Sequence, residues 1–326
     1  MPKCLIAPQT LASIEGPFLQ VLREAGFELV YPDKPLQLTE DELLERLKGV
    51  EASIAGSEPY TRRVIAAHPQ LRVTARAGVG YDAVDVAAAT EHGIAVCITP
   101  GTNQDAVAEH TFTLILALAK GLIPQHLATL QGKWPRTATL PLRGRTLGIL
   151  GLGRIGKAVA LRGIAFGMHI LAYEPLPDHA FIAQHGIQLA PLDTVIAQSD
   201  YLTVHVPLMP ESKYLINKRT LALMKPTAFL INTARGPLVN EADLYEALKA
   251  RRIAGAGIDV FEQEPPGKIP LFELDNIVVT PHAAGVDLQS RDDMALSSAQ
   301  SIVALAAGGW PAAAIVNPEV RSRFRW

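Results

Sequence analysis

The sequence has few cysteines and no strong excess of charge of either sign. Its two cysteines, Cys4 and Cys97, lie far apart and make neither a disulfide framework nor a CxxC metal pair. The formal net charge at pH 7 is −2, so nothing indicates nucleic acid or an acidic membrane surface as a partner. Cysteine usage of this kind is typical of a reducing compartment, and we expect a cytoplasmic protein.

Long hydrophobic runs are also missing. The first residues, "MPKCLIAPQTL", contain no long apolar core, so we expect no secretory signal. The most apolar stretch, residues 111–123, is too short to span a bilayer and contains Lys120. We expect it to be a buried helix. The histidines show no ligand spacing, and no metal is expected.

The chain has 326 residues, of which 48% are hydrophobic, which favours two domains. Short apolar runs alternate with helical patterns along it, which indicates an α/β fold with parallel strands. The expected strands are "KCLIA", "ASIAG", "LRVTA", "IAVCI", "TLGILG", "HILAYE", "YLTVHV", "AFLINT", "GAGIDV" and "NIVVTP". Junctions are expected within residues 97–103 and near Gly285, and the tail 313–326 should pack onto the first part.

A glycine-rich turn follows the strand "TLGIL". Gly151, Gly153 and Gly156 form GxGxxG between a strand and a helix, where they permit a tight turn, close approach to a diphosphate, and close helix–strand packing. The next strand ends at Glu174, where a carboxylate can accept hydrogen bonds from ribose hydroxyls. These features together predict a dinucleotide site at the helix N-terminus.

Polar residues follow three later strands. Arg235 comes after "AFLIN", Asp259 and Glu264 after "GAGI", and His282 after "NIVV". Ligands of open α/β sheets bind at these carboxyl ends of the strands. Hydride transfer on a 2-hydroxy acid needs a cation to grip the carboxylate and polarise the carbonyl, a histidine to move the proton, and a carboxylate to orient that histidine. The three strand ends supply one of each.

The chain resembles the D-isomer-specific 2-hydroxyacid dehydrogenase family over nearly its whole length. The matching motifs are "RAGVGYDAVD", "TPGTNQDAVAEHT", "TLGILGLGRIG", "HVPL", "INTARG", "DVFEQEP" and "TPHAAG". The resemblance implies that Arg235, Glu264 and His282 are catalytic and that the cofactor is NAD. The cofactor contacts that it implies are Val107, Gly151, Gly153, Arg154, Ile155, Gly156, Glu174, His205, Val206, Pro207, Thr233, Ala234 and Asp259.

The resemblance also implies the architecture. It predicts two doubly wound parallel-sheet domains, with a Rossmann cofactor domain at residues 101–285 inserted into a flavodoxin-like substrate domain at residues 1–100 and 286–326. The backbone amides of Val79 and Gly80 would bind the substrate carboxylate. Dimers formed through the cofactor domain are usual in this family, so a homodimer is expected.

The motifs are most similar to those of D-3-phosphoglycerate dehydrogenases and hydroxypyruvate reductase-like members, and the substrate stays open between these types. Where the former usually carry a phosphate-gripping arginine, this chain has Gly56, although Arg76 and Arg136 match other phosphate-side arginines. Further candidates to line the substrate pocket are Tyr60 and, contributed by a dimer partner, Trp134 or Arg136. Formate dehydrogenases of the superfamily have glutamine in place of Glu264, which argues against that activity. A corepressor-like nucleotide sensor is the alternative from another class, disfavoured because the chain has no long polar tail.

His110 and His205 also lie in these motifs, but neither is expected to be catalytic. Glu109 and His110 are neighbours on a helix and do not face each other, and we interpret them as interdomain packing. His205 is expected to line the adenine pocket rather than to catalyse a step.

Overall fold

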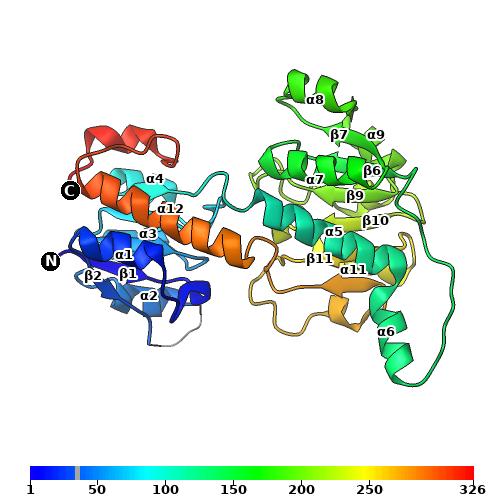
Figure 1. The fold of residues 1–326 in the computed structure, drawn as a ribbon, viewed down its shortest axis with the longest axis horizontal. Helices are drawn as coiled ribbons and strands as arrows, with labels where there is room; N and C mark the ends of the chain where they lie inside the picture. The colour runs from blue at the N-terminus through cyan, green and yellow to red at the C-terminus, as the bar shows by residue number, and fades with distance from the viewer. Residues whose placement is uncertain (34–36) are drawn as a thin grey trace. The chain divides into compact units, whose positions relative to one another are not determined.

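The computed structural model describes residues 1–33 and 37–326. The chain divides into two compact units (Figure 1). Unit 1 combines Met1–Asn103 with Val286–Trp326, and unit 2 is Gln104–Gly285. The chain therefore passes from one unit to the other twice, after Asn103 and after Gly285.

The described part of unit 1 contains a five-stranded parallel sheet in the order β2-β1-β3-β4-β5. This is the flavodoxin-like order that the resemblance implied. The sequence analysis missed β2, a three-residue edge strand without a fully buried residue. The strands are β1 Lys3–Ile6, β2 Glu28–Val30, β3 Ala52–Ala55, β4 Val73–Arg76 and β5 Ala95–Cys97.

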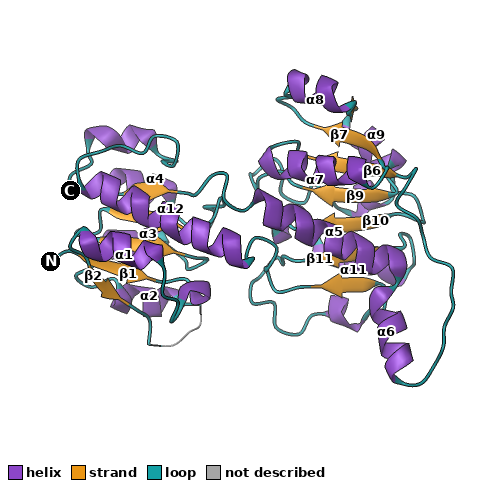
Figure 2. Cartoon of the chain, in the orientation of Figure 1, coloured by secondary structure: helices purple, strands orange, loops and turns teal. Residues whose placement is uncertain are grey.

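Helices cover both faces of this sheet (Figure 2). Because side chains alternate along a strand, Cys4 and Ile6 of β1 join the core under α1 and α12, whereas Leu5 joins the core under α2, α3 and α4. The tail packs on β5, where the Asn317 side chain bonds to Ile94 and Val96. The helices are α1 Pro17–Glu24, α2 Glu40–Arg46, α3 Arg62–Ala67, α4 Val86–Glu91 and α12 Leu288–Ala306, with short 3-10 turns η1 Gln9–Leu11 and η4 Pro318–Ser322.

Unit 2 contains a seven-stranded parallel sheet in the order β12-β11-β10-β9-β6-β7-β8. Counted from β6, this is the Rossmann order 3-2-1-4-5-6 with one strand added, and its topological switch point lies between β6 and β9. The sequence analysis missed β8, which has only two exposed residues. The strands are β6 Thr146–Leu150, β7 His169–Tyr173, β8 Gln188–Leu189, β9 Tyr201–Val204, β10 Phe229–Asn232, β11 Gly255–Ile258 and β12 Ile277–Val279.

The helices of unit 2 also cover both faces of their sheet. One core lies under α5 and α7, which pack side by side (Figure 1), and the other under α9, α10 and α11. The helices are α5 Gln104–Lys120, α6 Leu122–Leu130, α7 Arg154–Ala165, α8 His179–His185, α9 Leu192–Gln198, α10 Lys218–Leu221 and α11 Glu241–Lys249, with 3-10 turns η2 Gly236–Leu238 and η3 Pro270–Glu273.

The apolar run 111–123 is not one buried helix, contrary to the expectation. Helix α5 is buried along much of its length, but Gly121 adopts a left-handed conformation (φ 56°) and the chain then turns into α6, which has no buried residue.

In the described residues no single helix is long and apolar enough to cross a membrane. Helices α5 and α6 reach that length and apolarity only together, and they bend by 61° where they meet.

Candidate active site

The glycine loop of unit 2 lies at the switch point of its sheet, between β6 and α7. Gly151 has φ 94°, and a Cβ there would lie 2.8 Å from the carbonyl carbon of His205. A Cβ on Gly156 would lie 2.0 Å from the Gly151 carbonyl oxygen. At Gly153, by contrast, a Cβ would meet nothing within 4 Å. Two glycines therefore allow close packing inside the protein, and the third leaves open space in front of the helix.

The start of α7 offers hydrogen-bond donors to that space. In the described residues the backbone N–H groups of Gly153, Arg154 and Ile155 donate no hydrogen bond. Such groups at the N-terminus of a 12-residue helix favour an anion, and a diphosphate fits them. The loop is held by Glu174, whose two carboxylate oxygens accept from the N–H of Leu152 (2.7 Å) and of Leu176 (2.9 Å).

His205 lies directly after β9 and supports this loop with its backbone. Its ring bonds through Nε2 to the Thr203 hydroxyl at 2.9 Å, while Nδ1 is buried and has no partner among the described residues. Burial lowers the pKa of His205 to about 3, so the ring is neutral at physiological pH. A histidine that cannot become charged is unsuited to proton transfer at neutral pH, which agrees with the non-catalytic interpretation.

Arg235 follows β10 in a loop that is held by a buried amide. Asn232 is completely buried, and its side chain accepts from the N–H of Ala234 (3.1 Å) and donates to the carbonyl oxygen of Arg235 (2.8 Å). The guanidinium Nη1 donates to the Ala234 carbonyl at 2.6 Å. The sequence analysis missed Asn232, although an amide at the end of a buried apolar strand is a signal for such a brace.

The Arg235 loop packs directly against the loop that carries Glu264. A Cβ on Gly236 would lie 1.9 Å from the carbonyl carbon of Phe261, so the two backbones are in contact there. Glu264 accepts the N–H of Phe261 at 2.9 Å with one oxygen, and its other oxygen lies 2.6 Å from Nδ1 of His282. With Nδ1 bound to the carboxylate, Nε2 is the ring nitrogen left for a substrate.

The His282 loop is organised by the completely buried Asp259. The Asp259 carboxylate accepts the N–H groups of Ala283 and Ala284, each at 2.9 Å, and the Thr280 hydroxyl at 2.5 Å. The N–H of His282 donates to the Asp259 carbonyl at 2.7 Å. His282 itself has φ 53°, a left-handed conformation that is uncommon outside glycine. Asp259 thus fixes the backbone that carries the histidine.

His110 joins this network from α5, with contacts that the sequence analysis did not predict. Its Nε2 lies 2.9 Å from the Thr280 hydroxyl and 3.6 Å from Asp259 Oδ1. Since the hydroxyl donates its single proton to Asp259, it accepts from His110, and Nε2 therefore carries a proton. Glu109 instead pairs with Arg162 at 3.1 Å. Both residues make these contacts inside unit 2.

Helix α5 also reaches the loop after β10. The Thr111 hydroxyl lies 2.9 Å from the Thr233 hydroxyl and bonds to the Val107 carbonyl at 2.8 Å. The structure thereby brings Val107 and Thr233 close through Thr111, which the sequence analysis did not single out. Val206 and Pro207 directly follow His205 in the loop after β9.

Of the remaining candidates, Trp134 and Arg136 are exposed residues of unit 2, and the others lie in unit 1 at or beyond the carboxyl ends of its strands. Arg76 ends β4, and its Nε donates to the Gly80 carbonyl at 2.9 Å. In the described part of the chain the N–H groups of Val79 and Gly80 donate no hydrogen bond, whereas that of Gly78 bonds to the Thr99 hydroxyl. Gly56 follows β3, and its N–H donates to the carboxylate of Glu58.

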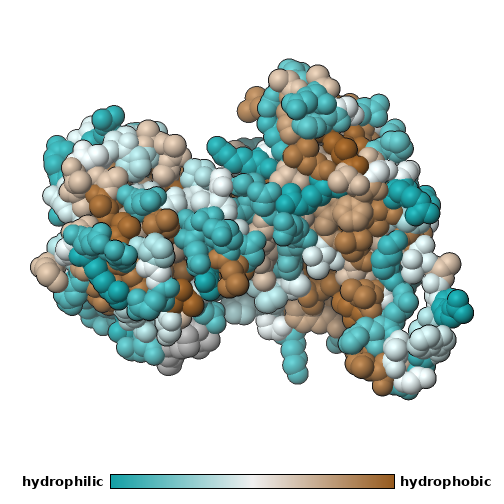
Figure 3. Space-filling model, in the orientation of Figure 1, coloured by the Kyte–Doolittle hydropathy of each residue, from teal (hydrophilic) through white to brown (hydrophobic). Residues whose placement is uncertain are grey.

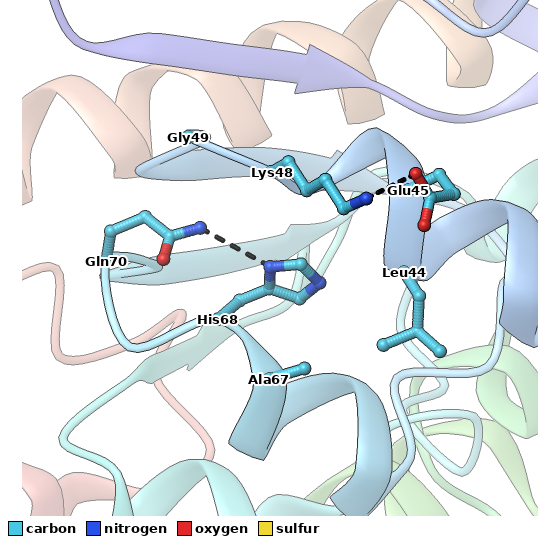
Figure 4. A pocket seen from close by; sticks show the side chains of 7 residues that line it. All are labelled: Leu44, Glu45, Lys48, Gly49, Ala67, His68 and Gln70. Carbon is cyan, nitrogen blue, oxygen red and sulfur yellow. Dashed lines mark hydrogen bonds and ion pairs between the residues drawn. The ribbon is translucent and has the colours of Figure 1, made fainter.

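A hollow in unit 1 lies near the amino ends of β3 and β4, opposite to the carboxyl ends just described (Figure 4). It is formed by the ends of α2 and α3 and by the segments that lead into β3 and β4, and His68, Gln70, Glu45 and Lys48 line it. The carboxyl ends of the strands point away from it, so it is not where an α/β sheet binds its substrate. The described residues contain no group of three or more His, Cys, Asp or Glu that could hold a metal ion.

The Thr280 hydroxyl offers a test of the network around Asp259. Thr280→Val removes one donor to the buried carboxylate and the acceptor of His110, so we expect unfolding to become about 1–2 kcal/mol easier. Guanidinium denaturation followed by circular dichroism measures this. The control is Thr113→Val on α5, where the exposed hydroxyl bonds only to a helix carbonyl. Equal effects of the two substitutions would show that the network adds no stability.

Comparisons with known proteins identify the family of this chain. Residues 112–284 match the family model described as D-isomer specific 2-hydroxyacid dehydrogenase, NAD binding domain. The chain is 39% identical over 313 residues to a glyoxylate reductase of Korarchaeum cryptofilum, covering 91% of this chain and 94% of that protein. It is 44% identical over 250 residues to a D-3-phosphoglycerate dehydrogenase of Methanocaldococcus jannaschii, covering 75% of this chain and 48% of that protein, which is therefore about twice as long as the matched region.

A solved structure shares the fold over almost the whole chain. It is a D-lactate dehydrogenase from Aquifex aeolicus complexed with NAD and lactic acid, with a TM-score of 0.86 and 28% identity, covering 96% of this chain and 98% of that one. The family model, the relatives and this structure lead to one conclusion. The chain belongs to the D-isomer specific 2-hydroxyacid dehydrogenase family, and residues 112–284 form its NAD-binding domain.

Proposed function

We propose that this protein is an NAD-dependent D-2-hydroxyacid dehydrogenase that reduces a small 2-oxo acid and oxidises the corresponding D-2-hydroxy acid. The observation that carries the proposal is the 2.6 Å contact between His282 Nδ1 and Glu264, next to the loop of Arg235 at the carboxyl ends of β10 to β12. This set supplies a proton carrier, its orienting carboxylate and a fixed cation, which the reaction requires.

The roles follow from the contacts. In reduction His282 donates the proton from Nε2 to the carbonyl oxygen, and in oxidation the same nitrogen takes the hydroxyl proton. Glu264 holds the ring through Nδ1 and stabilises the imidazolium. Arg235 binds the substrate carboxylate and polarises the carbonyl. NADH supplies the hydride when it is bound.

The cofactor site is proposed from the glycine loop. Gly153, Arg154 and Ile155 would bind the diphosphate with backbone N–H groups, and Glu174 would bind the adenosine ribose hydroxyls. A carboxylate has about four acceptor positions, so Glu174 can bind them while it holds Leu152 and Leu176. Nearby residues proposed to contact the cofactor are Val107, Gly151, Gly156, His205, Val206, Pro207, Thr233, Ala234 and Asp259.

Unit 1 is proposed as the substrate domain and unit 2 as the cofactor domain. The N–H groups of Val79 and Gly80 would bind the substrate carboxylate, because they are donors without an internal acceptor in the described residues. Arg76 and Gly56, at the ends of neighbouring strands, would lie toward the far end of the substrate. The substrate is of the hydroxypyruvate/glyoxylate or the 3-phosphoglycerate type.

We further propose a cytoplasmic location. Both cysteines are buried and unpaired, and burial raises the pKa of each thiol to about 12. Neither is a nucleophile at neutral pH, and a chain that depends on no disulfide suits a reducing compartment.

The proposed function is tested by turnover. The decrease of NADH or NADPH absorbance is followed with glyoxylate, pyruvate, hydroxypyruvate and 3-phosphohydroxypyruvate. We expect reduction with NADH in preference to NADPH, because Glu174 repels a 2′-phosphate.

Hydroxypyruvate or glyoxylate should have a kcat/KM at least equal to that of the phosphorylated acid. A preference of about 100-fold or more for the phosphorylated acid, some 2.7 kcal/mol, would indicate a dedicated phosphoglycerate dehydrogenase. A chain that binds NADH and reduces none of the acids would be a nucleotide-binding protein instead.

Arg235→Lys tests the cation. Lysine keeps the charge but cannot make the planar two-pronged contact to carboxylate and carbonyl, so kcat/KM should fall roughly 100-fold. The matched control is Arg219→Lys on α10, where the arginine forms a two-pronged pair with Asp193 on the surface. Nearly normal kcat/KM in Arg235→Lys would remove Arg235 from the substrate site.

A homodimer through unit 2 is proposed because α6 exposes an apolar surface. Leu122, Leu127, Leu130 and Trp134 are between 52% and 79% exposed, and hydrophobic surface is visible around α6 (Figure 3). A second copy of the chain would cover it. Light scattering should give twice the 35.0 kDa chain mass, and Leu127→Glu with Leu130→Glu should give monomers. Leu176→Glu, also on an exposed leucine of unit 2, is the control that should stay dimeric.

A further inference from the structure

A buried carboxylate near the proposed substrate loop has no role in the function described above. Glu58 is 2% exposed and lies two residues after Gly56, just beyond the carboxyl end of β3. One of its carboxylate oxygens accepts the Gly56 N–H at 2.5 Å. The other would lie 2.9 Å from a Cβ placed on Gly56. The side chain of Glu58 therefore turns back toward Gly56, and a Cβ at position 56 would also lie 3.3 Å from the Pro8 Cα.

Tyr60 holds the backbone of the loop that carries Glu58. The N–H of Tyr60 donates to the Glu58 carbonyl at 3.1 Å and to the Ala83 carbonyl at 2.8 Å. The ring of Tyr60 is completely buried, and its hydroxyl lies 2.5 Å from that of Ser53. The loop after β3 is thereby attached to the loop after β4, and these contacts hold the backbone of Glu58 in place.

Glu58 also interacts electrostatically with Arg76, which is 7% exposed and holds Gly80 through Nε. Burial is the largest effect and raises the pKa of Glu58, whereas the backbone N–H groups of Glu58 and Gly56 lower it and the positive charge of Arg76 lowers it least. Arg76 pairs with Ala55 in the register of β3 and β4, so Arg76 and Glu58 belong to the ends of neighbouring strands. Within residues 53–60 and 74–85, Arg76 is the only basic residue, and the acidic ones are Glu58, Asp82 and Asp85. A ligand near these segments meets one guanidinium whose charge is offset by a buried carboxylate.

We propose that Glu58 is a specificity-determining residue that selects against 2-oxo acids with a second anionic group, by offsetting the charge of Arg76. The inference rests on the proposed function, and it narrows the substrate to acids whose far end is uncharged, such as hydroxypyruvate or glyoxylate. Glu58 acts through Arg76 and is not a catalytic residue.

The geometry also predicts the effect of Gly56→Arg. The backbone of Gly56 is not left-handed, so the conformation does not exclude another residue. The obstacle is the Glu58 carboxylate, which would meet the new side chain and pair with its charge. Gly56→Arg alone should therefore give little gain toward a phosphorylated substrate, and the gain should appear when Glu58→Gln is added.

The central experiment measures a ratio of substrates. The ratio is kcat/KM for 3-phosphohydroxypyruvate divided by kcat/KM for hydroxypyruvate, with NADH, for wild type and Glu58→Gln. Glutamine keeps the shape and the acceptor for Gly56 but removes the charge, so the ratio should rise roughly tenfold. The ratio for glyoxylate against hydroxypyruvate should not change, because neither acid carries a second charge.

Glu51→Gln is the matched control. Glu51 directly precedes β3 and also accepts a backbone N–H, that of Lys3 at 2.7 Å. It lies at the amino end of β3, whereas Gly56 and Glu58 follow the carboxyl end. Its replacement should leave both ratios unchanged. A loss of structure would lower kcat/KM for all acids together, and a change in the ratio is therefore specific to charge.

The possible outcomes separate the two proposals. If wild type reduces none of the acids, the proposed function fails. If wild type is active and the ratio stays the same in folded Glu58→Gln, Glu58 does not select the substrate and the inference is overturned. Wild type with about a 100-fold preference for the phosphorylated acid, some 2.7 kcal/mol, also overturns it. Should Glu58→Gln not fold, the same ratio in Glu58→Ala decides.

Discussion

The buried carboxylate of Asp259 is the constraint on which the proposed catalytic histidine depends. A completely buried carboxylate is costly unless its oxygens are bound, and here two backbone N–H groups and one hydroxyl bind them. The same bonds hold the backbone on both sides of His282 in a conformation that non-glycine residues rarely adopt. These hydrogen bonds therefore stabilise the buried carboxylate of Asp259 and, at the same time, position His282. His110, through Thr280, extends this arrangement to helix α5.

The three histidines near the carboxyl ends of the unit 2 strands differ in their surroundings. His205 is half-buried with its Nδ1 shielded from solvent, and its low pKa keeps the ring neutral. His110 contacts a hydroxyl that already donates to Asp259, which determines the nitrogen that carries the proton. His282 has a carboxylate on one nitrogen and is 38% exposed. Of the three, His282 best combines a charge partner with access for a substrate, as a proton carrier requires.

Much of the fold could be predicted from the sequence, because its signals are local. The apolar runs of β6, β9, β10 and β11 are buried on both faces and are therefore nearly continuous, and the glycine spacing marks the first turn of α7. Short edge strands such as β2 and β8 have no comparable pattern. The break at Gly121 was missed because the apolar run continues across it, while a single left-handed residue redirects the chain.

The candidate site was predicted in its residue types but not in its supporting contacts. Arg235, Glu264 and His282 each follow a strand, so their convergence is a consequence of parallel topology. The roles of Asn232, Thr280 and His110 depend on distances between segments up to 170 residues apart. The role of Glu58 could not be predicted either, because its carboxylate contacts Gly56 only once the loop after β3 has folded.

The close contact at Gly236 has a consequence for how the sequence can vary. A Cβ there would overlap the Phe261 backbone at 1.9 Å, and no flexible side chain is available to move aside. Glycines such as Gly49, with open space around them, can be replaced at the cost of backbone strain alone. Position 236 has no such tolerance, because substitution would separate the Arg235 loop from the Glu264 loop. During evolutionary drift, the residue beside the proposed substrate-binding arginine is thus among the least free to change, although it contributes no chemical group of its own.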